Sequence, residues 1–436
     1  MNSQRLLLII AVLLGILILV NFFFSREKML TYNDNDKPNK ATEIIDRVKN
    51  QNERAKMQAY IDEYQKGQTI IKSIVGPSGD TIDFVDIYTQ PAIKKHKIAK
   101  EQLLLGPSTF PQIENESQQH ESFKDYKKGN MLYEITGDTC PQGAIPIQRL
   151  TMKTLARFET LEDFFKKGHG YIHPPCGGDG GSAAGHEYAH AARTNLSNWG
   201  GESLLSLWSP YVEKSNEFSL SQMWIVRGSG ADRETLEAGW QVYEDLYGDW
   251  RAHLFIYFTP DNYGSGGGYN LSTGDFVQVN NSVYIGGGFT DYSAINGSQY
   301  HIKLLIYKDG ARGDWWLRYG DTWVGYWPRS VFDTKGLYNE GSIIDFGGEI
   351  VNVRTDSRHT NTNMGSGYWP YQGYGYSSYH RNIKYVDVNN FYRNATGLNA
   401  TATNNNCYDI NLVESTGSWG VYFYFGGAGY NTSCKN

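Results

Sequence analysis

Short segments rich in aromatic and β-branched residues follow one another from Gly129 to the C-terminus, punctuated by glycines. In chain order they read QMWIVRG, HLFIYFTP, DFVQV, YHIKLLIYKD, DWWLRYGD, WVGYWP, SIIDFGGEIVNV, NIKYVDV and WGVYFYFGG. Such side chains favour strands, and glycines favour the turns between them. No helix of normal length is expected after about Lys167. Many short strands at near-regular spacing predict an all-β domain over residues 129–436, an antiparallel β-sandwich or barrel.

The composition supports this fold class and excludes one class of partner. Aromatic residues make up 14% of the chain and there are 48 glycines, which is untypical of long helical bundles. The net charge of −6 is spread along the chain, with no basic block. We therefore expect no nucleic-acid partner.

The N-terminal residues 1–25 have the pattern of a membrane-spanning segment. The run from Leu6 to Phe24 is apolar except at Gly15 and Asn21, and basic residues flank it. As a helix it would nearly span a bilayer core of roughly 30 Å. No small-x-small cleavage site follows, which favours an uncleaved signal anchor over a signal peptide. The rest of the chain should therefore enter the secretory pathway, and reach an extracellular or acidic compartment either membrane-anchored or secreted.

Residues 26–128 differ in character from the β-rich part. Residues 41–71 are rich in charged residues with interspersed apolar ones and predict a helix, while residues 81–88 alternate like a strand. Residues 107–128 are polar and predict an exposed linker. This part is therefore expected to be a small α+β unit that ends in a linker.

Two glutamates occupy settings unusual for an acid. Glu237 lies in TLEAGWQVYEDLYGDW, where a strand would place Gln241 on the same face and Trp240 on the opposite one. Glu349 lies in IIDFGGEIVNV, where two preceding glycines allow a close approach to the backbone. Two carboxylates on strands are candidates for paired acid and base catalysis. Alternatively, each is a paired or solvent-facing strand residue.

The segment His186 to His190 fits the H-E-x-x-H pattern of zinc peptidases. That chemistry requires both histidines on one face of a helix, with the glutamate as base. Gly185 stands directly before the motif and aromatic strands follow it. A third ligand such as Glu202 lies in no recognisable pattern. We therefore expect no metal site and no other cofactor.

Four cysteines, an even number, are typical of disulfides in an oxidising compartment. None has the C-x-x-C spacing of a metal or redox site. Among the three possible connectivities we favour the sequential one, Cys140–Cys176 and Cys407–Cys434. Sequons that suit a secreted glycoprotein occur at Asn115, Asn195, Asn270, Asn280, Asn296, Asn394, Asn399 and Asn431.

From Asp138 onward the chain resembles the neprosin family, named for a glutamic prolyl endopeptidase of plant origin. The matching blocks, in the family's order, are CPQGAIPIQR, HEYA, SLWSPYVE, EFSLSQMWIVRGSG, TLEAGWQVYEDLYGD, YFTPDNY, YNLSTGDFVQ, DWWLRYGDTWVGYWP, FGGEI, HTNTNMGSGYWP and WGVYFYFGG. Ahead of them, IIKSIVGPSGDTIDFVDIYTQPAI resembles the family's activation peptide. The resemblance implies that HEYA is part of a strand. The histidine that follows it, His190, then completes the zinc-peptidase pattern only by coincidence.

The resemblance implies a fold and a reaction. The fold would be a concanavalin-like, glutamic-peptidase-like β-sandwich whose concave face holds Glu237 and Glu349 as the catalytic pair. One ionised carboxylate would activate a water, and the other, protonated, would support the carbonyl oxygen and protonate the leaving amine. Which glutamate has which role stays open. The substrates would be proline-containing peptides cleaved after proline, and the chain's own propeptide would be an inhibitor. Because like charges oppose the ionisation of both members of a close pair, the two acids should share a proton more readily at acidic pH. We therefore expect an acidic optimum and acid-triggered removal of the propeptide.

Five further residues are weaker candidates for binding substrate. They are Gln222, Trp224, Trp240, Gln241 and Tyr257.

Two other functions remain open at this point. A lectin-like sandwich could use the same aromatic face to bind glycans or cell wall, although a binding module has little need of a propeptide. A glycoside hydrolase could use the same two glutamates, and only the family resemblance disfavours it.

Overall fold

The computed structural model describes residues 46–76, 78–114, 127–128, 139–167, 185–353, 358–415 and 417–435. All of them belong to one compact unit, residues 44–436. The predicted anchor Leu6–Phe24 lies outside these ranges. Within them, no helix is long and apolar enough to cross a bilayer.

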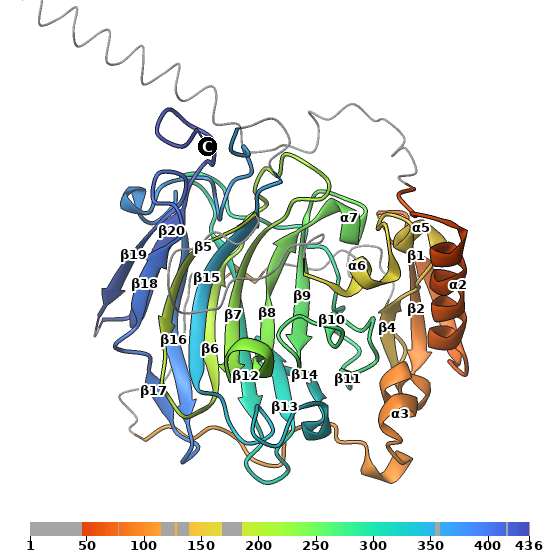
Figure 1. The fold of residues 1–436 in the computed structure, drawn as a ribbon. Helices are drawn as coiled ribbons and strands as arrows, with labels where there is room; N and C mark the ends of the chain where they lie inside the picture. Colours follow the sequence, from red (N-terminus) through yellow and green to blue (C-terminus); the bar gives the residue numbers. More distant parts are fainter. Residues whose placement is uncertain are drawn as a thin grey trace, which may run out of the picture. The chain divides into compact units, whose positions relative to one another are not determined.

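Two large sheets, built mostly from antiparallel strands, dominate the described residues (Figure 1). The seven-stranded sheet has the order β10-β9-β8-β7-β15-β5-β18. Its strands are β5 (His186–Arg193), β7 (Ser219–Arg227), β8 (Glu234–Val242), β9 (Ala252–Thr259), β10 (Gly268–Tyr269), β15 (Ile343–Val351) and β18 (Asn399–Ala402). The prediction of a mainly antiparallel β fold is confirmed.

The second sheet has ten strands in the described part of the chain. Its main path is β11-β14-β13-β12-β6-β16-β20-β19, with β17 on β16 and β3 parallel to β12. The strands are β3 (Lys127–Lys128), β6 (Asn198–Ser206), β11 (Val277–Gln278), β12 (Tyr300–Lys308), β13 (Trp315–Tyr319), β14 (Thr322–Trp327), β16 (Ser378–Asp387), β17 (Tyr392–Asn394), β19 (Asp409–Glu414) and β20 (Val421–Gly426).

The core of the sandwich lies between these two sheets. Met223 and Trp240 of the seven-stranded sheet share one buried cluster with Leu205 and Leu304 of the other. The Trp240 indole N–H donates to the carbonyl of Ser206 at 2.8 Å, so it joins β8 to β6. Alternation along each strand therefore sends one set of side chains into this core and the other set to the outer face.

Few helices occur after Lys167 among the described residues, as predicted. They are one short α-helix, α7 (Glu244–Tyr247), and the 3₁₀ turns η5 (Gly230–Asp232), η6 (Arg329–Val331) and η7 (Pro370–Gln372). A disulfide joins Cys407 to Cys434 across a Cα–Cα distance of 5.1 Å. Cys140 is buried and its predicted partner Cys176 lies outside the described residues, so that pairing stays a prediction.

The N-terminal part, by which we mean the described residues 46–102 and 139–167, forms a small α+β assembly beside β9, β10 and β11 (Figure 1). A three-stranded sheet, β1 (Ile70–Val75), β2 (Thr81–Asp86) and β4 (Ala144–Gln148), carries the longest helix of the described residues, α2 (Gln51–Gln65). Shorter helical segments are η2 (Ile87–Thr89), α3 (Pro91–His96), η3 (Lys100–Gln102), α5 (Met152–Leu155) and α6 (Leu161–Phe165). The side chain of Asn50 begins α2 by accepting hydrogen bonds from two backbone N–H groups.

This small sheet draws on both sides of the boundary predicted between residues 128 and 129. β4, which lies after that boundary, pairs with β2, which lies before it. α5 and α6 then follow β4 and pack with α2. The predicted helix and strand thus appear as α2 and β2, and the assembly extends at least to α6.

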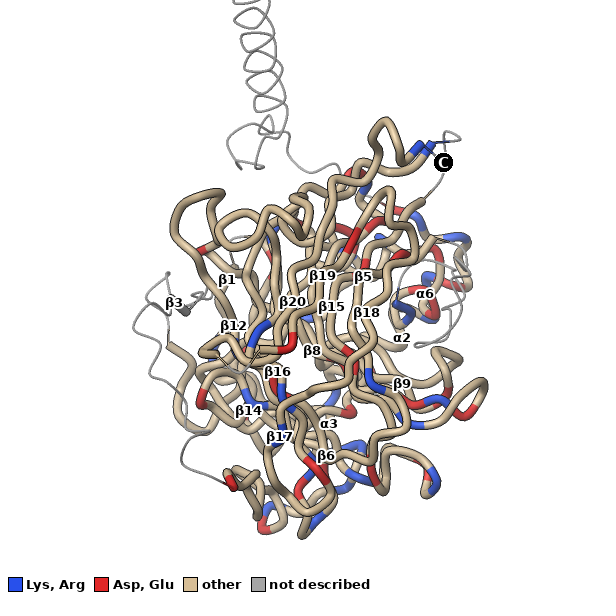
Figure 2. The backbone as a smooth tube through the Cα atoms, turned by 90° about the vertical axis from the view of Figure 1, so that its left-hand side faces the viewer, with Lys and Arg blue, Asp and Glu red and all other residues tan. Residues whose placement is uncertain are grey.

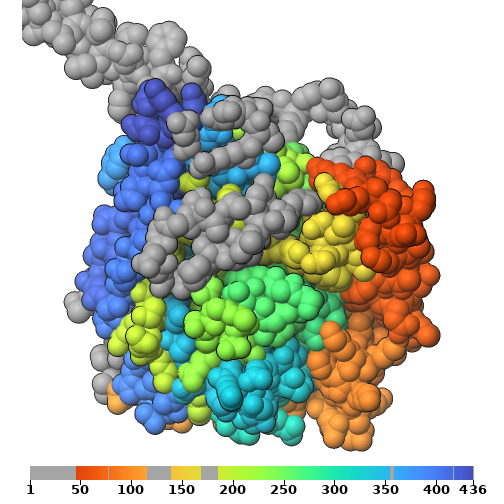
Figure 3. Space-filling view, viewed as in Figure 1, coloured from red at the N-terminus to blue at the C-terminus, as the bar shows by residue number. Residues whose placement is uncertain are grey.

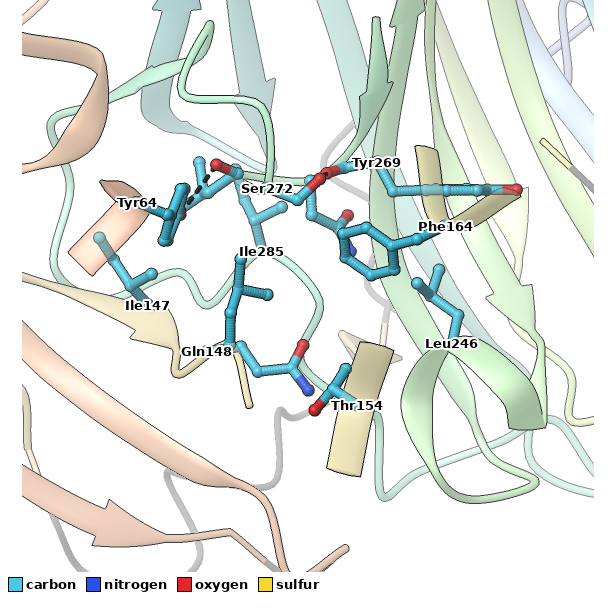
Figure 4. Close-up of a pocket in the computed structure, with 12 residues that line it drawn as sticks. Tyr64, Ile147, Gln148, Thr154, Phe164, Leu246, Tyr269, Ser272 and Ile285 are labelled. Atoms are coloured by element: carbon cyan, nitrogen blue, oxygen red, sulfur yellow. Dashed lines mark hydrogen bonds between the residues drawn. The ribbon is translucent and has the colours of Figure 1, made fainter. Parts of the chain in front are cut away.

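The N-terminal part packs directly against the sandwich (Figure 3). Figure 4 shows a small cavity where α2, β4, α5, α6 and α7 meet the loop after β10. There Tyr64 donates to the carbonyl of Leu271 at 2.9 Å. The cavity measures about 30 Å³, so it can hold little more than a water molecule. The two parts are therefore closely fitted in the intact chain.

Along the described residues, charged residues of both signs are interspersed (Figure 2).

The titratable side chain of His380 lies inside the sandwich. His380 of β16 contacts Ser203 Oγ of β6 at 3.0 Å and Ser221 Oγ of β7 at 2.8 Å, so it links the two sheets. Burial lowers the pKa of His380 to about 3.

We predict that the folded chain loses stability as the pH falls from about 6.5 to about 3. The unfolded histidine binds a proton near pH 6.5, whereas the folded one resists it, so stability is complete above 6.5 and declines through this window. The loss from His380 should be on the order of 4 kcal/mol. Urea unfolding at several pH values measures it, and His380→Gln should flatten the dependence. An unchanged dependence in that variant would contradict this origin.

Candidate active site

Pairing between strands brings Glu237 and Glu349 to the same face of the seven-stranded sheet. β7 lies between β8 and β15, and it pairs with both. Glu237 is opposite Trp224 of β7, and Glu349 is opposite Leu220 of the same strand. Because Leu220 and Trp224 are an even number of positions apart, their side chains and those of the two glutamates point the same way. This face is the one directed away from the core between the sheets.

Gln222 occupies the middle of this face. It lies opposite Gly239 of β8 and Gly347 of β15. Its amide Nε2 donates to Glu349 Oε2 at 3.0 Å. The two neighbouring glycines present no side chain, so Gln222 is the residue of β7 whose side chain lies between those of the two glutamates.

The ammonium of Lys167 lies between the two carboxylates. Its Nζ is 2.6 Å from Glu237 Oε2 and 2.7 Å from Glu349 Oε2. All three side chains are buried, with 1% of the lysine and 0% of each glutamate exposed. One small cation therefore bridges both acids in a site closed to solvent.

Each carboxylate has a different set of additional partners. Glu349 Oε1 contacts His186 Nδ1 at 2.6 Å. Glu237 Oε1 accepts hydrogen bonds from the hydroxyls of Thr235 at 2.9 Å and Tyr263 at 2.8 Å. A histidine can stabilise an ionised carboxylate, whereas hydroxyls suit either protonation state. The two acids are therefore chemically distinct.

The H-E-x-x-H segment forms strand β5, so the helix that a zinc peptidase motif needs does not form. His186 and His190 point to the face of the glutamates, and Glu187 points to the other. His190 Nδ1 contacts both carboxylate oxygens of Asp345, at 2.8 and 2.9 Å. Burial alone would lower the pKa of His190, but Asp345 outweighs it and raises that pKa.

Among the described residues, one group has the ligand types and spacing to hold a metal ion, and it does not include His186 or His190. His359, Cys407 and Cys434 have their ligand atoms close together. The two cysteines are joined in a disulfide, so they offer no thiolates.

The weaker candidates for substrate binding divide into three groups. Gln222 and Trp224 lie at the carboxylate pair, and Tyr257 lies opposite Glu237 on β9. Gln241 is on the same face but farther along β8, where it donates to Tyr269 at 3.1 Å. The prediction for Trp240 is wrong, because its side chain lies in the core between the sheets.

Sequence reasoning missed Lys167, Thr235 and Tyr263. Thr235 could have been predicted from the sequence, since it stands two positions before Glu237 and so lies on the same face of the strand. Tyr263 follows Asn262 in a turn where both residues have positive φ, +59° and +55°. Such backbone is uncommon outside glycine and often occurs at functional sites. Here it directs the tyrosine hydroxyl at Glu237.

The glycines before Glu349 do allow a close approach, as predicted, but of the protein itself. A Cβ on Gly347 would lie 2.4 Å from the carbonyl oxygen of Ala189 in β5. A Cβ on Gly348 would lie 2.4 Å from the ring of Phe425 in β20. The two glycines therefore fix how closely β15 approaches β5 and the second sheet.

Comparisons with known proteins match the chain to two family models. Residues 215–428 match the model described as Neprosin, and residues 73–192 match the model described as Neprosin activation peptide. Lys167 lies within the second match, and both glutamates lie within the first.

Two solved structures resemble parts of the chain. One is scytalido-glutamic peptidase with a peptide-based transition-state analogue, at 11% identity over 56% of this chain and 98% of that one, with a TM-score of 0.32. The other is CG-16, a homodimeric agglutinin from chicken liver, at 11% identity over 38% and 96%, with a TM-score of 0.21. Likenesses at these scores say nothing about function.

We predict that Gly347→Ala destabilises the fold, by about 1–3 kcal/mol, because the added methyl group forces β5 away from β15. Urea unfolding measures the change. Gly106→Ala is the matched control, since no heavy atom lies within 4 Å of a Cβ added there. Equal stability of the two variants would show that β5 and β15 are not this closely apposed.

Proposed function

Because the chain belongs to the neprosin family, we propose that it is a glutamic endopeptidase made as a zymogen, which cleaves peptides on the C-terminal side of proline at acidic pH. The observation that carries this proposal is the pair of buried carboxylates, Glu237 and Glu349, close enough to share one ammonium. Once that ammonium leaves, a water molecule at the same position could contact both acids.

The different partners of the two acids suggest their roles. Glu349, beside His186 and Gln222, is the ionised base that takes a proton from the water as its oxygen attacks the peptide carbonyl carbon. Glu237, beside two hydroxyls, is the protonated acid that gives its proton to the carbonyl oxygen. The tetrahedral intermediate then collapses as Glu349 passes its proton to the leaving nitrogen and the C–N bond breaks. Glu237 recovers its proton from the intermediate, which leaves an acid and an amine as products.

The N-terminal part is the proposed activation peptide, because it covers the face that carries the glutamates. Ile61 of α2 and Phe164 of α6 belong to one buried cluster with Leu220, Tyr257 and neighbouring residues of the sandwich. A substrate strand could not reach the pair while this cluster is intact. Removing or displacing the N-terminal part would open the face.

Acid should weaken the attachment of this part. Asp275 of the sandwich contacts Lys95 at 2.7 Å and His96 at 3.2 Å. Burial alone would raise the pKa of Asp275, but hydrogen bonds from His96 and Lys95 outweigh it and lower that pKa. A carboxylate with a lowered pKa stabilises the assembly above its ordinary pKa, and this stabilisation is lost as the pH falls through the lowered value. Acid therefore favours release.

Proline preference and location follow from the same proposal. Trp224 and Tyr257 flank Glu237 and present aromatic surfaces against which a proline ring could pack. The enzyme would act in the secretory pathway or outside the cell, either released or held at the membrane by Leu6–Phe24, in an acidic compartment.

We predict that Glu237→Gln and Glu349→Gln each lower peptide cleavage by about 10²–10⁴-fold, the range for loss of a general acid or base. The assay incubates the acid-treated protein with a proline-containing peptide library from pH 2.5 to 7 and identifies fragments by mass spectrometry. Glu340→Gln, a surface glutamate paired with Arg227, is the matched control and should retain activity.

Three outcomes would contradict the proposal. Full activity in either glutamine variant would exclude the carboxylate pair. Cleavage abolished by a chelator would indicate a metal enzyme. Cleavage of sugars without cleavage of peptides would favour a glycoside hydrolase.

We predict that His186→Gln shifts the acidic limb of the kcat/KM profile to higher pH by about 0.5–1 unit, because a neutral amide stabilises an ionised base less than a histidine that can carry charge. Tyr263→Phe, which alters the partner of Glu237 instead, should leave that limb in place. The opposite pattern would exchange the roles of the two glutamates.

A further inference from the structure

Lys167 reaches the carboxylate pair from the end of α6. The short helix places Phe164 and Phe165 against aromatic residues of both parts. Phe165 packs edge-on against Tyr60 of α2, with ring centres 5.1 Å apart, and its carbonyl accepts a hydrogen bond from Tyr257 of β9 at 3.2 Å. The backbone just before Lys167 is thus fixed to the strand beside Glu237.

Glu237 and Glu349 compensate the charge of Lys167. Burial alone would lower the pKa of Lys167, but Glu237 and Glu349 outweigh it and raise that pKa above its usual value. The ammonium also lies 5.4 Å from the ring centre of Trp224. The π-electrons of the indole ring attract a positive charge at this distance. A buried charge in a protein interior needs such partners to be tolerated. The glutamates and Lys167 therefore stabilise one another in the intact chain.

The neighbouring lysine shows that this contact is specific. Lys166 points outward, where 31% of its side chain is exposed, and its Nζ contacts Glu162 at 2.6 Å. The two adjacent lysines thus have different environments, one exposed and one buried. Of the two, Lys167 is the one that enters the site.

We propose that Glu237 and Glu349 form a binding site for a primary ammonium, which Lys167 fills in the intact chain and thereby keeps the peptidase inactive. This inference rests on the proposed function. It assigns the inhibition to one side chain, in addition to the covering of the face by the N-terminal part.

The ammonium blocks the reaction in two ways. It occupies the position between the carboxylates where the attacking water is needed. It also occupies one oxygen of each glutamate, Oε2 in both, through its contacts at 2.6 and 2.7 Å. Those oxygens are then not available to the water or to the carbonyl oxygen of a substrate.

The same contacts make the block sensitive to acid. Protonating either glutamate removes half of the compensation for the buried ammonium, and Lys167 then favours water over the site. Among the described residues, other titratable or charged groups near the site include His186 and His190 of β5, Asp345 of β15, Tyr257 of β9, and Tyr263 and Asp261 after β9; its own segment carries Glu162, Asp163 and Lys166. His190 and Asp345 contact each other, whereas Glu237 and Glu349 contact the ammonium directly.

The test compares activation of the intact chain with that of Lys167→Met, which keeps a long side chain without charge. Cleavage of a short proline-containing peptide and processing of the chain are followed from pH 7 to 3. Lys167→Met should become active at a pH higher by about 1 unit, with about tenfold faster processing at a fixed pH. Lys166→Met is the matched control and should behave as the wild type, while Lys167→Arg, which keeps the charge, should restore much of the block.

Distinct results separate the two levels of the proposal. If all chains gain activity after acid treatment but Lys167→Met has the activation pH of the wild type, the ammonium is not the inhibitor. If no chain shows activity after acid treatment, the proposed peptidase function fails and the inhibition with it.

A second measurement examines the contact without using activity. At pH 7.5 a water-soluble acylating reagent should label Lys166 at least about tenfold faster than Lys167, because the ammonium held by two carboxylates and shielded from solvent is a poor nucleophile. Mass spectrometry of the digested protein measures both sites. Equal labelling would overturn the occupied site.

Discussion

One interaction, a single ammonium shared by two buried carboxylates, constrains much of the structure. A charged lysine or a pair of ionised glutamates is unfavourable in a site closed to solvent unless opposite charges compensate it. Removing one partner of such a buried group costs about 3–5 kcal/mol of stability. Lys167, Glu237 and Glu349 are each 1% exposed or less. The strands must therefore set the spacing of the acids, and the N-terminal part must deliver the lysine to them.

The sandwich supplies that spacing through its strand order. β7 lies between β8 and β15, the strands that carry the two acids, and Gly239 and Gly347 leave the middle of the face to Gln222. The second sheet packs against the opposite face, where Phe425 of the second sheet and Trp240 of the first belong to one buried cluster. The same carboxylates that the fold brings together for chemistry thus also bind the segment that covers them.

Local patterns predicted the strands and both glutamates, because alternation and residue type are visible within a few positions. The same alternation places Trp240 on the face away from Glu237. It therefore already argues against a role of Trp240 in binding substrate beside the glutamates. Lys167 could not be found this way, since it lies 70 and 182 positions from its partners and its short segment has no period. The pairing of β4 with β2 and the contact of His186 with Glu349 are likewise set by distant strands.

The most direct test is an experimental structure of the acid-processed protein at a pH where it cleaves peptides. We predict that Lys167 has left the site and that a water molecule lies within hydrogen-bond distance of both Glu237 and Glu349, where the lysine Nζ lay. An active protein with Lys167 still between the two carboxylates would contradict it.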